Sequence, residues 1–372
     1  MRYCRRRTNA NHANLLCHGE RRRTVSQPSY GANWATNRIV HETRVSSAAM
    51  QIVVEDLAKT FRVAERTAGL AGAVRGLVRR KHRDVSALAG VSFSLAAGEL
   101  VGYIGPNGAG KSTTIKVLAG ILVPTSGRVE VAGRVPWRER IEHVRRIGVV
   151  FGQRTQLWWD LPVVESLDML RHIYKVPADA FRTQRDELIE LLDLAGILDT
   201  PVRQLSLGQR MRADLAASLV HAPEILFLDE PTIGLDAVSK LAVRAFVKRL
   251  NRERRVTVIL TTHDMDDIEA LCDRVIVIDG GAIVSDGTLA DLRNTVTRER
   301  WLTVDVAGDA SEVGDADATV IRREGERVCL AFDPEVVSPA ELIRRVTSRH
   351  EVRDLFVENP PIETVIARMY QR

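Results

Sequence analysis

The stretch of sequence that predicts chemistry most directly is a glycine-rich loop that ends at Lys111. It reads Gly105-Pro106-Asn107-Gly108-Ala109-Gly110-Lys111-Ser112-Thr113 and matches the phosphate-binding pattern G-x-x-x-x-G-K-[ST] at every position. Glycines allow consecutive backbone N–H groups to face one anion, and the N-terminus of a following helix adds its positive dipole. We expect Lys111 to reach the β- and γ-phosphates of a nucleotide and Ser112 to give a hydroxyl to Mg²⁺. The loop therefore predicts a site for a nucleoside triphosphate and magnesium.

A pair of acidic residues, Asp229-Glu230, follows an apolar run over residues 225–228. The run has the length of a buried central strand, which would hold both carboxylates at its carboxyl end. From there Asp229 can hold Mg²⁺ through water, while Glu230 can polarise an attacking water molecule as a general base. Such a run is a weak signal alone, but behind a phosphate-binding loop it predicts nucleotide hydrolysis.

Strands must position these loops, and the sequence predicts such strands between residues 51 and about 290. Short apolar runs alternate there with helical stretches, which is typical of an α/β domain with a largely parallel sheet. The predicted strands cover residues 51–56, 91–95, 100–104, 127–131, 147–151, 225–229, 256–261 and 275–279. A strand at 100–104 and a helix opening at 113–118 flank the loop, which makes a chance glycine-rich turn a poor alternative. Asp279-Gly280-Gly281 and Asp286-Gly287 are predicted turns.

Two stretches depart from the alternation of strands and helices. Residues 155–222 contain no predicted strand, and their periodic Leu, Ile and Ala positions indicate a helical subdomain inserted into the sheet domain. Residues 62–86 interleave basic and apolar side chains, which predicts an amphipathic helix. The expected fold is therefore an α/β P-loop sheet domain over residues 50–296 that contains a helical subdomain.

The C-terminal part of the chain has a different pattern. Residues 297–372 are predicted to form a small α+β accessory domain with no catalytic motif. Its predicted strands cover residues 301–306, 327–332 and 352–357, and its predicted helices cover 338–348 and 362–370.

The N-terminal residues 1–49 carry nine arginines against two glutamates, a formal charge of +7, so that the rest of the chain carries −2 of the total +5. The segment has no apolar periodicity and is predicted to be a disordered basic extension. Because a strand-like run starts directly after Met50, we interpret Met50 as the true start and residues 1–49 as a mis-called upstream segment.

Composition excludes several classes of protein. The sequence contains no run of about 18 consecutive apolar residues, so it predicts no membrane-spanning helix, and action at a membrane would require a partner. Since the basic charge belongs to the N-terminal segment, charge does not predict a nucleic-acid-binding surface. The four cysteines lack CxxC spacing and predict neither a zinc site nor a disulfide framework, which fits a reducing cytosol.

The run Leu205-Ser206-Leu207-Gly208-Gln209-Arg210 narrows the class of nucleotide hydrolase. Here the sequence resembles the ABC ATPase family, whose signature is usually written LSGGQ. The resemblance implies that two subunits associate head to tail around two ATP molecules, so that the signature of one closes on the γ-phosphate held by the other. Ser206, Gly208 and Gln209 match the signature. Leu207 replaces the usual first glycine, so its backbone must avoid positive φ and its side chain must point away from phosphate.

The same resemblance assigns roles to four further residues. Gln153 matches the glutamine that contacts Mg²⁺ or water and relays motion to the helical subdomain. Asp236, in Pro231-Thr232-Ile233-Gly234-Leu235-Asp236, matches the D-loop residue that faces the partner subunit. His263 matches the switch histidine on the γ-phosphate, and Phe61 matches the aromatic residue that stacks on adenine. An ordinary core position is the alternative for Phe61.

The resemblance also implies partners. Trp158 and Trp159, in the run Gln156-Leu157-Trp158-Trp159-Asp160-Leu161-Pro162, lie where the family receives a coupling helix from a membrane permease, and we expect one of them to pack inward. The motif variants are most similar to exporters with separate permease chains, which would place the protein peripherally at the cytoplasmic face of the membrane. A soluble ABC ATPase that is not coupled to transport is the alternative. The sequence does not predict the transported substrate.

Overall fold

The computed structural model describes residues 50–64, 82–152 and 154–370. The predictions for residues 1–49, the middle of the 62–86 segment and Gln153 lie outside the described residues. Within the described ranges, no helix combines the length and the apolar character needed to cross a bilayer.

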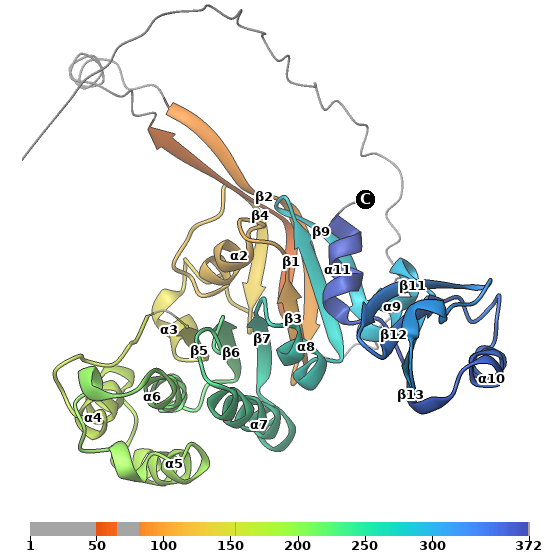
Figure 1. Cartoon of the computed structure of the whole chain (residues 1–372). Helices are drawn as coiled ribbons and strands as arrows, with labels where there is room; N and C mark the ends of the chain where they lie inside the picture. Colours follow the sequence, from red (N-terminus) through yellow and green to blue (C-terminus); the bar gives the residue numbers. More distant parts are fainter. Residues whose placement is uncertain (1–49, 65–81, 153, 371–372) are drawn as a thin grey trace, which may run out of the picture. The chain divides into compact units, whose positions relative to one another are not determined.

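A six-stranded sheet forms the centre of the fold, in the order β5-β6-β7-β3-β8-β9 (Figure 1). Its strands are β5 (Ile147–Phe151), β6 (Ile225–Asp229), β7 (Thr257–Thr261), β3 (Leu100–Ile104), β8 (Arg274–Asp279) and β9 (Ala282–Thr288). The first five are parallel, and β9 pairs antiparallel to β8. Every residue of β6 and β7 is buried, as expected for parallel strands that are covered on both faces. The α/β fold predicted from the sequence is confirmed.

A second sheet of three antiparallel strands packs beside the first, in the order β2-β1-β4. It contains β1 (Met50–Ala64), β2 (His82–Ala96) and β4 (Ser126–Val131). The prediction of one largely parallel sheet is therefore wrong for residues 51–56, 91–95 and 127–131. The predicted helix at 62–86 is wrong at both ends, because residues 62–64 and 82–86 pair as strands, with Phe61 opposite Val85 and Val63 opposite Arg83.

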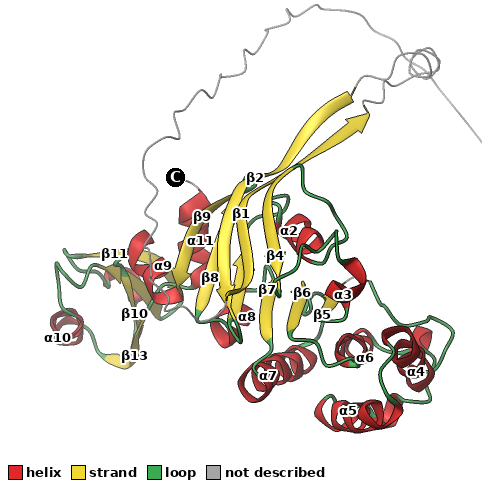
Figure 2. Cartoon of the chain, turned by 180° about the vertical axis from the view of Figure 1, so that it is seen from behind, coloured by secondary structure: helices red, strands yellow, loops and turns green. Residues whose placement is uncertain are grey.

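Helices cover the faces of the central sheet. They include α2 (Lys111–Leu118), α3 (Arg140–Val144), α7 (Ala237–Arg254), α8 (Met265–Leu271) and α9 (Leu289–Val296). The strand-free segment folds as α4 (Val163–Tyr174), α5 (Ala178–Leu191) and α6 (Leu207–Leu219), with short 3-10 turns at Ala195–Ile197 and Val202–Gln204. Figure 2 shows α4, α5 and α6 grouped together, and α6 contacts both α4 and strand β5. One apolar core runs from these helices to the face of the sheet.

The C-terminal residues form a four-stranded antiparallel sheet in the order β11-β12-β10-β13. Its elements are β10 (Arg300–Val306), β11 (Ala318–Glu324), β12 (Arg327–Phe332), β13 (Val352–Glu358), helix α10 (Pro339–Arg349) and a 3-10 turn at Ala310–Glu312. Leu302, Leu330 and Leu342 belong to a core of its own. The last helix, α11 (Ile362–Tyr370), instead buries Ile362, Val365 and Ile366 in the core shared with the central sheet.

Two strands were absent from the sequence prediction. Strand β9 contains Asp286 and Gly287, which were predicted to form a turn, but Asp286 pairs with Ile276 in the neighbouring strand. Strand β11 is mostly exposed and therefore lacks the apolar alternation that marks a strand. In both cases the neighbouring strand supplies the hydrogen bonds that the local sequence does not predict.

Candidate nucleotide-binding site

The glycine-rich loop joins β3 to α2, as the sequence predicts. Gly110 caps α2 with φ of 110°, a left-handed conformation that side chains disfavour. A Cβ atom at Gly110 would also lie 2.7 Å from the carbonyl oxygen of Ala87 and 2.6 Å from a methyl group of Leu88. The loop therefore packs against strand β2 so closely that only glycine fits at this position.

Lys111 is the cation of this loop, and only 7% of the residue is exposed. Its ammonium group donates to the carbonyl oxygens of Gly105 at 2.7 Å and Pro106 at 3.2 Å. Burial lowers the pKa of Lys111, while the nearby carboxylates of Glu230 and Asp229 act in the opposite direction. The positive charge is thus held inside the loop, facing the two acidic residues.

Strand register brings the acidic side chains to the loop. In the parallel pair β6–β7, Asp229 lies opposite Thr261. The hydroxyl groups of Ser112 and Thr261 both donate to Asp229 Oδ1, at 3.1 Å and 2.6 Å. Asp229 is 8% exposed, and these two hydrogen bonds fix the orientation of its carboxylate.

The Ser112 and Asp229 pair fits a magnesium ion in its chemistry. Both groups offer oxygen ligands, which Mg²⁺ prefers, and Mg²⁺ usually takes few protein ligands and completes its shell with water and phosphate oxygens. The third residue predicted for this site, Gln153, is outside the described residues. Ser112 and Asp229 would hold the ion.

Glu230 and His263 form the second pair at the site. Glu230 has φ of 59°, and its backbone N–H donates to the Thr261 carbonyl at 2.9 Å. His263 Nδ1 and Glu230 Oε2 are 2.5 Å apart, and the His263 side chain is 58% exposed. The structure thus brings together Lys111, Ser112, Asp229, Glu230 and His263, which are far apart in the sequence.

The signature residues lie at the start of α6. Ser206 is the N-cap: its hydroxyl oxygen accepts from Gln209 N at 3.2 Å, while Gln209 Oε1 accepts from Ser206 N at 2.9 Å. The hydroxyl proton of Ser206 is not used in this capping box and can be donated to another oxygen. Among the described residues, no hydrogen bond joins the run 206–209 to the glycine-rich loop.

Leu207 lies beside the D-loop of the same subunit, and Gly208 lies beside Ser239 at the start of α7. Leu207 is the first residue of α6 and has no positive φ, as predicted. One of its methyl groups would lie 3.1 Å from a Cβ atom at Gly234. A Cβ atom at Gly208 would lie 2.3 Å from the Ser239 hydroxyl, so a larger residue here would force the Ser239 side chain to move. The leucine that replaces the usual glycine therefore packs beside the D-loop.

The D-loop is tied to α7 and to the region of His263. Asp236 caps α7, and its carboxylate accepts from Ser239 N at 2.9 Å and from Ser239 Oγ at 2.7 Å, which holds the pKa of Asp236 below its usual range. Asp267 is fully buried and accepts from Thr262 Oγ1 at 3.1 Å, from Arg244 Nε at 2.5 Å and from the Thr232 hydroxyl. One carboxylate therefore links the D-loop, the switch-histidine loop and α7.

Phe61 lies in the β1–β2 hairpin. It is half-buried, with the Lys59 ammonium group 5.2 Å from its ring centre. Lys59 pairs with Leu88, which contacts Gly110 of the loop. The hairpin thus brings Phe61 to the neighbourhood of the phosphate-binding loop, and adenine stacking by Phe61 remains a proposal.

Three polar residues with buried hydrogen bonds in the site or elsewhere in this domain were not predicted from the sequence. Thr261 looks like an ordinary strand-end threonine, and only the register shows that it bonds Asp229. Asp267 and Asp214 carry a detectable signal, because each is an acidic residue within a helix at a position that packing buries. Acidic residues are rarely buried without partners, so such positions are worth testing for a network.

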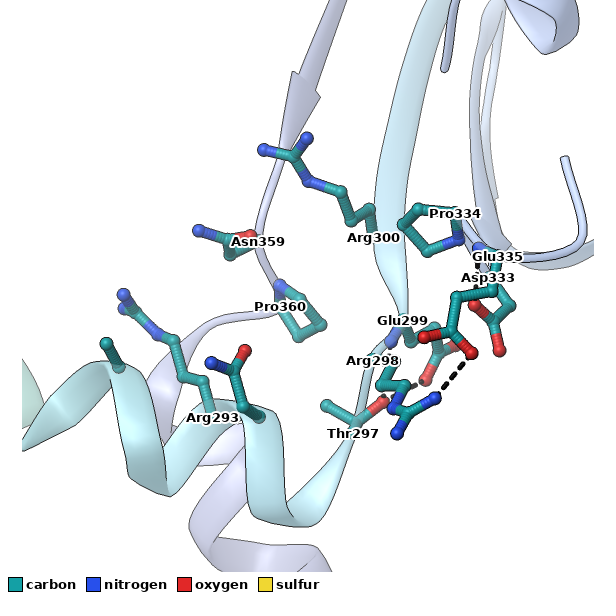
Figure 3. Close-up of a pocket in the computed structure, with 12 residues that line it drawn as sticks. Arg293, Thr297, Arg298, Glu299, Arg300, Asp333, Pro334, Glu335, Asn359 and Pro360 are labelled. Carbon is teal, nitrogen blue, oxygen red and sulfur yellow. Dashed lines mark hydrogen bonds and ion pairs between the residues drawn. The ribbon is translucent and has the colours of Figure 1, made fainter. Parts of the chain in front are cut away.

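A surface pocket of about 490 Å³ lies apart from these residues (Figure 3). Arg293, Arg298, Arg300, Asp333 and Glu335 line it, and Arg298 pairs with Glu335. It contains none of the predicted site residues, and its mixed charges define no binding chemistry.

Comparison with known proteins agrees with this geometry. A family model described as ABC transporter matches residues 88–233. A daunorubicin resistance ATP-binding protein, DrrA3 of Streptomyces coeruleorubidus, is 38% identical over 240 residues, which cover 64% of this chain and 74% of the relative. A methionine import ATP-binding protein, MetN of Geobacillus kaustophilus, is 40% identical over 208 residues, which cover 55% of this chain and 60% of the relative.

A solved structure shares the fold. It is the dimeric post-hydrolysis state of the ATP-binding cassette MJ0796 bound to ADP and Pi. The TM-score is 0.53 at 25% sequence identity, over 64% of this chain and 98% of the other.

Proposed function

Because this chain belongs to the ATP-binding proteins of ABC transporters, we propose that it hydrolyses ATP in the presence of Mg²⁺ and drives export through separate membrane permease subunits. The observation that carries the proposed ATP hydrolysis is the convergence of Lys111, Asp229, Glu230 and His263 at the carboxyl ends of neighbouring strands. The carboxyl end of a parallel sheet is where α/β proteins bind their ligands.

The chain's own residues account for binding and for activation of water. Lys111 would exchange the carbonyl oxygens of Gly105 and Pro106 for phosphate oxygens. Ser112 and Asp229 would hold a magnesium ion, which would supply charge neutralisation on the phosphates. Glu230, which is hydrogen-bonded to His263 at 2.5 Å, would accept a proton from the attacking water as general base.

The complete site requires a second copy of the chain. Ser206 is the N-cap of its own helix α6. Among the described residues, it makes no hydrogen bond to the glycine-rich loop of the same subunit. The MJ0796 cassette was solved as a dimer bound to ADP and Pi, which supports association of two copies. In the head-to-tail dimer that the family resemblance implies, Ser206 and Gly208 of one subunit would meet the phosphate held by the other. In that dimer, Asp236 would face the partner.

The surface for the permease would lie on the helical subdomain. Trp158 is half-buried and packs against the core, whereas Trp159 is 50% exposed. Met169 and Ile173 of α4 are also exposed. An exposed tryptophan suits a docked helix, and these exposed apolar side chains of α4 belong to the same helical subdomain.

Export rather than import is supported by the resistance relative and by the motif variants, including Leu207 and the run around Trp158. The methionine import relative shows that identity alone does not decide the direction. No nucleic-acid partner is proposed, because the described domain carries no basic motif of that kind.

Co-purification with the membrane proteins of neighbouring reading frames, followed by reconstitution into vesicles, tests this function. We expect ATP hydrolysis to be faster with the membrane partner, and substrate to accumulate on the side of the membrane opposite the ATPase. Accumulation on the ATPase side would contradict export. Equal hydrolysis with and without every membrane partner would instead favour an ATPase that is not coupled to transport.

A further inference from the structure

Asp214 is a buried acidic residue that the ATP site does not use. It lies in the middle of α6, is 4% exposed, and is flanked by the buried residues Ala213 and Leu215. Burial raises the pKa of Asp214 to about 6, with hydrogen bonds from Thr155 and Gln156 and the charge of Arg210 acting in the opposite direction. A carboxylate at such a position is destabilising unless its partners are well placed.

The partners of Asp214 come from the segment that follows strand β5. Asp214 Oδ1 accepts from Thr155 Oγ1 at 2.8 Å and from Gln156 N at 3.0 Å. In return, Gln156 Nε2 donates to the backbone oxygen of Asp214 at 3.0 Å. The Thr155 hydroxyl oxygen also accepts from Leu157 N at 3.1 Å. Segment 155–157 is thus fastened to the signature helix by side chains and backbone together.

Segment 155–157 lies between strand β5, which precedes it in the chain and pairs with the acidic strand of the ATP site, and the exposed Trp159, which follows it. Upstream, Arg154 N donates to the Phe151 carbonyl of β5 at 2.8 Å. Gly152 N, at the end of the same strand, donates to the Asp229 carbonyl of the ATP site at 2.8 Å. Downstream, the guanidinium group of Arg210 lies 5.6 Å from the ring of Trp159, and Arg203 N donates to the Trp159 carbonyl at 3.0 Å. Arg210 lies one turn before Asp214 on α6, and the same helix starts at Ser206.

We propose that Asp214 is a positioning residue that joins the segment after β5 to the signature helix, so that Ser206 and the Trp159 surface move with residues 154–157 as one unit. The proposal rests on the proposed function, because it concerns closure of Ser206 on the partner's nucleotide. Asp214 acts through the helix and contacts no nucleotide.

Two substitutions separate the hydrogen bonds from the charge. Asn at position 214 keeps an Oδ1 atom that can accept from both Thr155 and Gln156, whereas Leu removes the acceptor at similar volume. Thr155→Val removes one donor and leaves the Asp214 carboxylate bonded to Gln156. Asp186→Leu, at an exposed position on α5 of the same subdomain, is the matched control.

The test is ATP-dependent dimerisation of the full chain in the Glu230→Gln background, measured by sedimentation, beside nucleotide binding and melting temperature. We expect Asp214→Leu and Thr155→Val to weaken dimerisation by about tenfold to a hundredfold with ATP binding to the monomer preserved. Asp214→Asn and Asp186→Leu should stay within about twofold of the parent.

Dimerisation of both Asp214→Leu and Thr155→Val at the parent's affinity would overturn the proposal. So would a defect in Asp214→Asn as large as that in Asp214→Leu. If Asp214→Leu does not fold, Thr155→Val alone provides the test: weakened dimerisation supports the proposal, and dimerisation at the parent's affinity overturns it. If the Glu230→Gln parent itself does not dimerise with ATP, the composite-site function fails, which is a different result from parent-like dimerisation of the variants.

Discussion

The carboxylate of Glu230 stands on a backbone conformation that few non-glycine residues adopt. With φ of 59°, and with its N–H bonded to Thr261, the side chain is directed by the backbone toward His263. Such conformations are found where the surrounding structure over-determines them, often at functional sites.

Glu230→Gln should therefore leave ATP binding intact and slow hydrolysis by about a hundredfold or more, because the amide cannot accept the proton from water. Steady-state turnover and equilibrium binding of ATP provide the measurement. Glu224→Gln, at the exposed position just before β6, is the control and should hydrolyse ATP normally. A Glu230→Gln protein that turns over like wild type would exclude Glu230 as the base.

Asp214 predicts a pH dependence of stability. Its pKa is raised in the folded state to about 6, so the folded protein gains stability from this group below the unfolded pKa and loses it as pH rises through about 6. Compared with Asp214→Asn, the wild-type protein should become less stable between pH 4 and pH 7, by at most on the order of 3 kcal/mol. Urea unfolding of both proteins at several pH values measures this difference, and a difference that does not change with pH would contradict the prediction.

At the scale of elements, the two tryptophans after β5 differ in burial. Trp158→Ala should lower both the melting temperature and ATP hydrolysis, because its ring packs on the core. Trp159→Ala should keep the melting temperature and basal hydrolysis but weaken co-purification with the permease, by about 2 kcal/mol or more if it is an anchor residue. Retention of normal permease binding by Trp159→Ala would place the docking surface elsewhere.

The elements around the loop could be predicted because their signals are local. Strand β3, helix α2 and strand β6 each carry an apolar pattern next to a motif, and the helical region at 155–222 has a clear period. Strands β9 and β11 could not be predicted in the same way, since Asp286-Gly287 favours a turn locally and β11 is polar. Their conformations depend on the strands beside them.

The sequence predicts which residues belong to the site, but not which of them contact one another. Lys111, Asp229 and Glu230 follow from motif spacing, and the family resemblance indicates Ser206, Gly208 and His263. The bond from Thr261 to Asp229 depends on the β6–β7 register, and the bond from Thr155 to Asp214 joins residues 59 positions apart. Hydrogen bonds between residues so far apart in the sequence cannot be predicted from a local sequence pattern.

At the scale of the whole molecule, activity should depend on two copies. Ser206→Arg protein mixed with Lys111→Ala protein should regain ATP hydrolysis that neither has alone, because each mixed dimer contains one site with an intact loop and an intact signature. Turnover of the mixture against each separate protein is the measurement. A mixture as inactive as its components would indicate sites built within one subunit.

The last helix should stabilise the ATP-binding core rather than the C-terminal sheet. Ile362 is fully buried in the core shared with the central sheet, so Ile362→Ala should destabilise that core by about 2–5 kcal/mol. Glu363→Ala, at the next and exposed position, should cost little. Leu342→Ala should affect only the unfolding transition of the C-terminal sheet. If Ile362→Ala and Leu342→Ala weaken ATP binding equally, the two cores are not independent and the prediction is wrong.

Because α11 returns to the ATP-binding core, the C-terminal sheet is held to that core by two covalent tethers, at α9 and at α11. The C-terminal sheet is therefore a module that can be exchanged in protein engineering. A short linker or another small domain can replace the residues between α9 and α11, provided that α11 is retained. Cutting the chain after α9 would be a different operation, since it would also remove part of the core and expose its apolar side chains to aggregation.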